Sequence, residues 1–221
     1  MTRVEFDRHL RELKDELLEM GSMVEKALAR AIDALKKRDM EMARLIVEDD
    51  SKINKKRFDI EEKCVELIAT QQPLARDLRQ IVSILHMTVD LERMGDHAEG
   101  IARINIRMGD EPLLKPLIDV PRMAQLGIDM THRALQAFID LNVENARAVC
   151  KADDEVDALY DQVYRELLVY MIQDPRTIQR ATYLLWIAHD LERIADRATN
   201  IAERVVFTVT GKMDEVGVSK Y

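Results

Sequence analysis

The sequence predicts an all-α protein of six long helices, arranged as two tandem, pseudo-symmetric three-helix bundles. Glycine and proline number only seven and five in 221 residues, while residues that favour helices abound. Apolar residues recur at helical spacing along almost the whole chain. The second half of the chain repeats the pattern of the first, and short loops between long helices enforce antiparallel packing within each half.

Three helices are expected in the first repeat, residues 1–110. The first helix spans about 7–37. Asp39 is a suitable N-cap for the second helix, which extends to about residue 70. The segment TQQPLARD then turns the chain, and Pro73 suits the first turn of a third helix that ends near residue 108.

The pattern starts again after one clear linker, MGDEPLLKPLIDVPR, which holds three prolines and a glycine. We place the linker at 111–120 and the second repeat at 121–210. The helices of this repeat are expected at about 121–140, 143–173 and 175–209. Residues 211–221 are expected to form a frayed tail.

The repeat is specific in its residues. DMEMARLIVEDDSKIN aligns with NVENARAVCKADDEVD at an offset of 103, which matches Asp50 with Asp153 and Asn54 with Asp157. The third helices align at an offset of 100. The positions that recur there are Asp90, Leu91, Glu92, Arg93, Asp96, Ala98, Ile101 and Ala102, each followed by the same residue 100 positions later.

Charge and cysteine content exclude several classes of protein. A net charge of −8 argues against broad binding to nucleic acid or to anionic membranes, which need a basic surface. The two cysteines, Cys64 and Cys150, lie far apart, which argues against a disulfide framework and fits a reducing cytosol. The N-terminus has no apolar signal core, and no run of 18 apolar residues predicts a membrane span.

Asp50 and Asp153 each lie inside an apolar stripe of the second helix of their repeat. Their neighbours on that face are Ile46, Val47 and Ile53 in the first repeat and Val149, Cys150 and Val156 in the second. An unpaired carboxylate in such a stripe costs several kcal/mol, so each aspartate needs a partner or a cation.

On the third helices, Glu92 with Asp96 and Glu192 with Asp196 continue the line of the core stripe. Like charges four residues apart weaken a helix. Neither glutamate has a basic residue three or four positions away, apart from His189 behind Glu192. The same unfavourable spacing therefore appears twice.

The helical hairpins are expected to bring these acids together. Asp50 lies about 22 residues before the turn near residue 72 and Met94 about 22 after it, so at ~1.5 Å per residue their levels match. The same count from the turn near residue 174 matches Asp153 with Ala195. The two expected clusters are Asp50, Asn54, Glu92 and Asp96 in the first repeat and Asp153, Asp157, Glu192 and Asp196 in the second.

Clustered carboxylates favour a hard or borderline cation such as Mg²⁺, Mn²⁺, Ca²⁺ or iron. Zinc is less favoured without Cys and His ligands. In the alternative interpretation the acids face solvent or form interhelical ion pairs. The arginines available for such pairs are Arg44, Arg93, Arg147 and Arg193. The acids recur at the same level of the hairpin in both halves. On the residues alone, metal binding and the alternative of ion pairs or solvent exposure are then about equally supported.

The segments QQPLARDLRQI, DLERMGDHAEGIA and DLERIADRATNIAE resemble the PhoU family of bacterial phosphate-transport regulators, and the resemblance covers nearly the whole chain. It implies paired three-helix bundles and metal clusters that hold iron, zinc, magnesium or manganese. The family's ligand positions carry over to Asp50, Asn54, Glu92, Asp96, Asp153, Asp157, Glu192 and Asp196, together with Asn200 of the NIA element.

The sequence departs from the family pattern at a few of these positions. Glu99 and Gly100 replace the NIA element that the second copy keeps at Asn200, and Ala195 replaces the usual glycine. Asn54 leaves the first cluster with one charge less. The second cluster is therefore expected to be the stronger ligand set.

The resemblance implies a regulator rather than an enzyme. It implies negative regulation of the phosphate-starvation response and of phosphate uptake, through an adaptor between the ATPase subunit of a phosphate ABC transporter and a sensor histidine kinase. It further implies a cytoplasmic homodimer that reaches the membrane only through these partners.

Two other functions stay open. The first is a metalloenzyme, such as a phosphohydrolase, that uses the carboxylate clusters. Against it, the chain has no Glu-x-x-His motif for di-iron chemistry and no general base apart from the expected ligands. The second is a helical scaffold whose acids form salt bridges.

Overall fold

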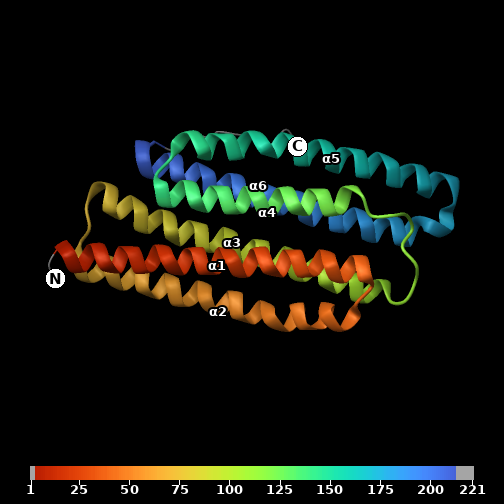
Figure 1. Cartoon of the computed structure of the whole chain (residues 1–221), viewed down its shortest axis with the longest axis horizontal. Helices are drawn as coiled ribbons and strands as arrows, with labels where there is room; N and C mark the ends of the chain where they lie inside the picture. The colour runs from red at the N-terminus through yellow and green to blue at the C-terminus, as the bar shows by residue number, and fades with distance from the viewer. Residues whose placement is uncertain (1–2, 213–221) are drawn as a thin grey trace.

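The computed structural model describes residues 3–212 and confirms the all-α class. Its elements are α1 (Arg3–Lys37), α2 (Met40–Gln71), α3 (Ala75–Met108), α4 (Asp119–Asp140), α5 (Val143–Gln173), a short 3₁₀ helix (Pro175–Thr177) and α6 (Ile178–Thr210). Each repeat is an antiparallel three-helix bundle (Figure 1). The expected tail, 211–221, falls almost entirely outside the described residues.

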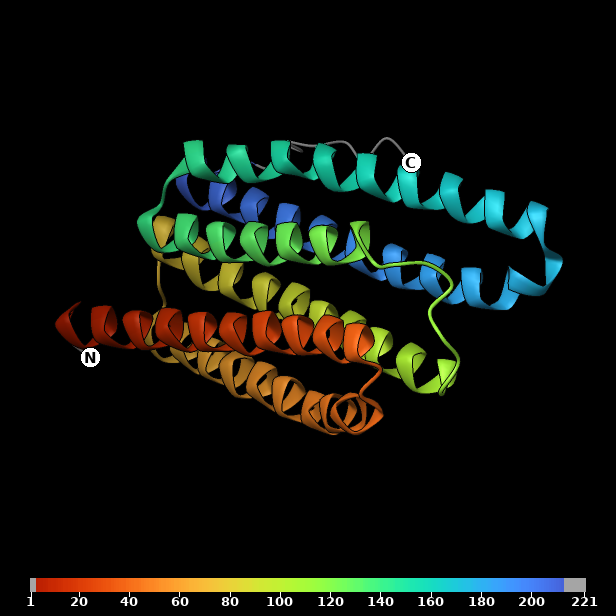
Figure 2. The same ribbon diagram turned by 45° about the vertical axis from the view of Figure 1, so that its right-hand side comes forward.

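The two bundles pack side by side through α3 and α6, which run antiparallel at the centre of the molecule. In Figures 1 and 2, α1 and α4 lie in front of this central pair, with α2 and α5 at the outer edges. One continuous hydrophobic core runs through both repeats, and its fully buried members include Met94 and Ile101 of α3 and Ile194 of α6. The repeats are therefore fused rather than separate units.

The sequence predicts most helix boundaries through their capping residues. Asp39 accepts a hydrogen bond from the backbone N–H of Met42 at 2.9 Å, which confirms it as the N-cap of α2. Asn142 caps α5 in the same way, through the N–H of Asn145 at 3.0 Å. The expected bounds of α5, 143–173, are those observed.

Three boundary predictions were wrong. Pro73 lies in the turn ahead of α3, not in its first turn, because the helix starts at Ala75 after Leu74. The helix α4 starts at Asp119, inside the expected linker, since Pro121 fits an N-terminal turn whose N–H groups have no helical partner. The segment Pro175–Thr177 is a 3₁₀ turn that precedes α6.

A reciprocal polar contact joins the two repeats across the α3–α6 interface. Asp90 of α3 accepts hydrogen bonds from Arg197 at 3.3 Å and from Asn200 at 3.2 Å, both on α6. Asp190 of α6 pairs with Nδ1 of His97 on α3 at 3.0 Å. Because Asp90 aligns with Asp190 and Arg197 with His97 at the offset of 100, the contact follows the pseudo-symmetry of the duplication.

Two further sequence expectations concern the cysteines and the membrane. Cys64 and Cys150 are both buried free thiols, so no disulfide joins them. None of the helices in residues 3–212 combines the length and the apolar character that crossing a bilayer requires.

Candidate metal centres

In the first repeat the hairpin of α2 and α3 brings four carboxylates together. Burial raises the pKa of Asp50 to about 6, with further contributions from the negative charges of Glu99, Asp96 and Glu92 on α3. Asn54 donates a hydrogen bond from Nδ2 to Asp50 at 2.8 Å, and this bond lowers the pKa of Asp50. The acids expected on the two helices therefore lie at one level.

The second repeat holds a matching cluster between α5 and α6. Burial, together with the negative charges of Asp157, Asp196 and Glu192, raises the pKa of Asp153 to about 7. Burial and Asp196 likewise raise the pKa of Glu192 to about 7. Burial disfavours the charged form of each carboxylate, and the neighbouring acids add to that effect. A bound cation would relieve both.

Three carboxylate oxygens in these clusters are buried and lack a hydrogen-bond partner: Oε2 of Glu92, Oδ1 of Asp153 and Oε2 of Glu192. A buried acceptor without a partner costs about 1–3 kcal/mol, and more when it is charged. Two of the three oxygens belong to the second cluster. The donor set, made of carboxylates with unsatisfied oxygens, fits a hard cation.

Arginines compensate part of the negative charge. Arg57 of α2 contacts Glu92 at 3.0 Å, and Arg93 and Arg193 contact Asp96 at 3.1 Å and Asp196 at 2.6 Å, respectively. No basic residue lies three or four positions from Glu92 on α3, but Arg57 reaches it from the neighbouring helix. Tyr160 takes the place of Arg57 in the second repeat, at the offset of 103.

Within residues 3–212, no three His, Cys, Asp or Glu side chains converge closely enough to hold one ion as they stand. Glu92, Asp96 and Asp196 are instead turned toward arginines, as in the 2.6 Å contact between Arg193 and Asp196. Binding of a cation by these three carboxylates would require them to rotate away from the arginines. A cavity of about 180 Å³, lined in part by Asp50, Gly95 and Glu99, opens beside the first cluster.

The structure does not bring Asn200 to the second cluster. Its side-chain amide donates to Asp90 at 3.2 Å, in the polar contact between α3 and α6. The aligned position in the first repeat is Gly100, where an added Cβ would lie 3.2 Å from the carboxylate of Asp190. Both positions therefore serve the interface between the repeats.

Glu99 and Arg57 belong to the first cluster although the sequence argument did not include them among its members. Glu99 follows Glu92 by seven residues, and Arg57 follows Asp50 by seven residues on α2. Two helical turns return a side chain to nearly the same face, so extending the search to the seventh residue finds both.

Gly95 sets the distance between α2 and α3 at the first cluster. A Cβ at this position would lie 3.2 Å from Ile53 Cδ1 and 3.4 Å from Asp50 Oδ1. Glycine therefore lets α2 pack closely where Asp50 meets α3, whereas the second repeat carries Ala195 at the aligned position.

Comparisons with known proteins agree with this architecture. The family model described as the PhoU domain matches twice, at residues 17–104 and 120–205. A relative from Clostridium acetobutylicum, named a phosphate-specific transport system accessory protein PhoU homolog, is 40% identical over 96% of this chain and 97% of the relative. An Aquifex aeolicus protein of the same name is 39% identical over 84% of each chain.

Solved structures give the same result. The crystal structure of PhoU from Pseudomonas aeruginosa is similar with a TM-score of 0.89 at 38% identity, covering 94% of this chain and 100% of that one. The phosphate transport system regulatory protein PhoU from Streptococcus pneumoniae is similar with a TM-score of 0.88 at 34% identity, covering 95% and 99%. This chain, with its two tandem three-helix repeats, belongs to the PhoU family.

Proposed function

We propose that the protein is an accessory regulator of a phosphate-specific transport system. The observation that carries the proposal is the similarity, over both repeats, to proteins named as accessory or regulatory components of such systems. In this role it lowers phosphate uptake and represses the phosphate-starvation response when phosphate is plentiful.

We assign it the role of an adaptor. One partner is the ATPase subunit of the phosphate ABC transporter, and the other is a sensor histidine kinase of the phosphate response. The protein acts as a cytoplasmic homodimer and reaches the membrane through these two partners. The long helices support this role, since they offer extended surfaces without requiring a catalytic cleft.

The carboxylate clusters are proposed to bind divalent or trivalent cations, such as iron, magnesium, manganese or zinc. The residues that would hold them are Asp50, Asn54, Glu92, Asp96 and Glu99 in the first repeat and Asp153, Asp157, Glu192 and Asp196 in the second. A bound cation would neutralise carboxylates from both helices of a hairpin. The buried oxygens of Asp153 and Glu192 without hydrogen-bond partners support this assignment.

The chain is not proposed to be an enzyme, although its clusters leave a phosphohydrolase as the alternative. The carboxylates that would hold a metal do not supply a separate general base, and His97, whose charge acts on Glu192, is paired with Asp190 at 3.0 Å. Steady hydrolysis of a phosphate ester by the purified protein, abolished by Glu192→Ala, would favour the enzyme.

Deleting the gene tests the regulatory proposal. In a medium rich in phosphate, expression of phosphate-starvation genes is expected to rise in the deletion strain and to return to its low level when the wild-type gene is restored. Unchanged expression after deletion would count against the regulatory role, irrespective of whether the protein binds metal.

A further inference from the structure

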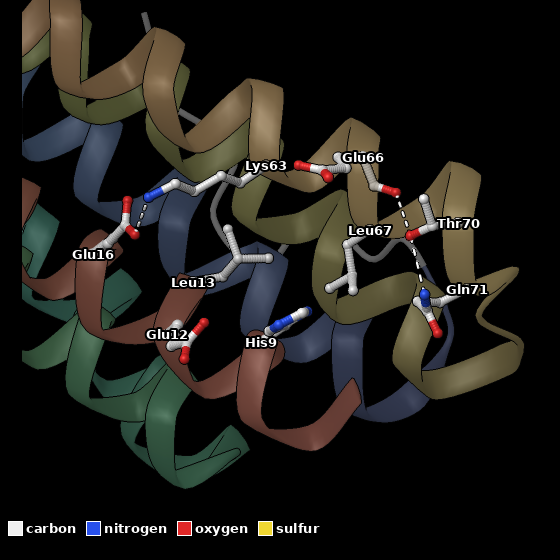
Figure 3. A pocket seen from close by; sticks show the side chains of 9 residues that line it. All are labelled: His9, Glu12, Leu13, Glu16, Lys63, Glu66, Leu67, Thr70 and Gln71. Atoms are coloured by element: carbon white, nitrogen blue, oxygen red, sulfur yellow. Dashed lines mark hydrogen bonds and ion pairs between the residues drawn. The ribbon is translucent and has the colours of Figure 1, made fainter. Parts of the chain in front are cut away.

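A groove of about 280 Å³ lies between the N-terminal half of α1 and the C-terminal half of α2, and none of the residues of either carboxylate cluster lines it (Figure 3). Its apolar floor consists of Leu13 and Leu67, which are buried. The polar residues that line it are His9, Glu12 and Glu16 from α1 and Lys63, Glu66, Thr70 and Gln71 from α2.

The walls of the groove carry more acid than the chain neutralises. Glu16 is partly compensated, since Lys63 reaches its Oε1 across the groove and Lys56 lies 3.7 Å from its Oε2, although Oε2 is buried and accepts no hydrogen bond within the described part of the chain. Glu12 has the exposed Arg8 at 3.8 Å and is near enough to Lys63 for their charges to interact. The carboxylate of Glu66 receives no hydrogen bond or ion pair from residues 3–212. Two carboxylates on opposite walls, Glu12 on α1 and Glu66 on α2, therefore flank an apolar floor, and neither accepts a hydrogen bond from a cationic side chain of residues 3–212.

The duplicated repeat does not keep this excess of acid. At the offset of 103, Glu66 corresponds to Val169. Glu12 has no counterpart on a helix, because α4 starts only at Asp119. Because both repeats share one fold, the fold itself does not require an acid at the position of Glu66.

We propose that this groove docks a protein partner through an arginine side chain, which inserts between Glu12 and Glu66. The aliphatic stem of an arginine would lie on Leu13 and Leu67, and its planar guanidinium carries enough N–H groups to donate to both carboxylates. The inference goes beyond the proposed function and requires no metal.

A pair of labelled peptides tests the docking site. The first is a fluorescein-labelled Ala-Leu-Arg-Ala-Ala-Leu peptide, and the second replaces arginine by citrulline, which has nearly the same shape without the charge. In fluorescence-anisotropy titrations the arginine peptide is expected to bind the wild-type protein about tenfold more tightly than the citrulline peptide. The double variant Glu12→Gln/Glu66→Gln is expected to remove that difference.

The matched control is Glu41→Gln/Glu144→Gln, which changes the net charge equally at two exposed positions outside the groove. It is expected to keep the tenfold preference. If the control also loses the preference for the arginine peptide, the preference reflects only the overall charge of the protein. If the wild-type protein binds both peptides equally, the groove does not bind an arginine side chain. If spermidine displaces the arginine peptide at equimolar concentration, the groove is a polyamine site and the proposal of a protein partner is wrong. If the double variant does not fold, the single variants Glu12→Gln and Glu66→Gln replace it, and each is expected to bind the arginine peptide about threefold more weakly.

Discussion

Asp153 on α5 and Glu192 on α6 share one partly buried site, and each has a carboxylate oxygen without a hydrogen-bond partner. The duplication places Asp50 and Glu92 at the matching level of the first repeat, but there Arg57 meets Glu92 at 3.0 Å. This difference predicts which of the two clusters binds a cation more tightly. Both clusters hold four carboxylates, but the second has fewer cationic partners, and it should therefore bind a cation more tightly.

The pKa values predict how stability depends on pH in protein stripped of metal. The folded-state pKa is raised to about 7 for Asp153 and Glu192 and to about 6 for Asp50. Folding therefore takes up protons, and the stability that these groups contribute is present below pH ~4 and is lost as pH rises to ~7. Because water screens these partly exposed carboxylates, we expect a decrease of about 1–2 kcal/mol.

Urea unfolding of the chelator-treated protein at pH 5 and at pH 8 measures this decrease. In the variant Asp153→Asn/Glu192→Gln the free energy of unfolding should differ less between pH 5 and pH 8, because neither replaced side chain titrates. An unchanged difference in that variant would show that other groups cause the pH dependence.

Replacing Arg57 should strengthen cation binding at the first cluster. Arg57 competes with a cation for Glu92, and Tyr160 stands at the aligned position of the second repeat. With the second cluster removed by Asp153→Ala/Glu192→Ala/Asp196→Ala, we expect Arg57→Gln to bind Mn²⁺ about tenfold more tightly in a calorimetric titration. Arg44→Gln, on the same helix, is the control. Weaker binding by Arg57→Gln would show that the arginine supports the site instead.

Asp90 should hold the two repeats together. It is 9% exposed and accepts hydrogen bonds from Arg197 and Asn200. We expect Asp90→Ala to lower the free energy of unfolding by about 1.5–3 kcal/mol, because both donors of α6 lose a charged acceptor. A double-mutant cycle with Arg197→Ala in urea measures the coupling, and independent, additive effects would argue against a direct contact.

The local parts of this structure were predictable from sequence, and the reason is geometric. Unbroken helices with a constant rise let the residue count from each turn place Asp50 opposite Glu92 and Asp153 opposite Glu192. Asp39 marked the start of α2 because its side chain has a local role in capping.

The parts that depend on contacts between helices were harder to predict. Arg57 was missed because the arginines considered as partners in the first repeat, Arg44 and Arg93, did not include the position seven residues after Asp50 on α2. Asn200 was assigned to the second cluster from family resemblance, yet it donates to Asp90 across the α3–α6 interface. That interface joins helices that are not consecutive in the chain, and helical periodicity alone does not determine which of them become neighbours.

Metal content tests the central claim most directly. After purification without chelator, the wild-type protein is expected to carry stoichiometric metal in elemental analysis by mass spectrometry. The triple variant Asp153→Ala/Glu192→Ala/Asp196→Ala should lose the metal of the second cluster. A charge-matched variant at exposed acids, Asp15→Ala/Glu41→Ala/Glu62→Ala, should retain it. Wild-type protein without metal, or full metal content in the triple variant, would contradict the assignment of the second cluster as a metal centre.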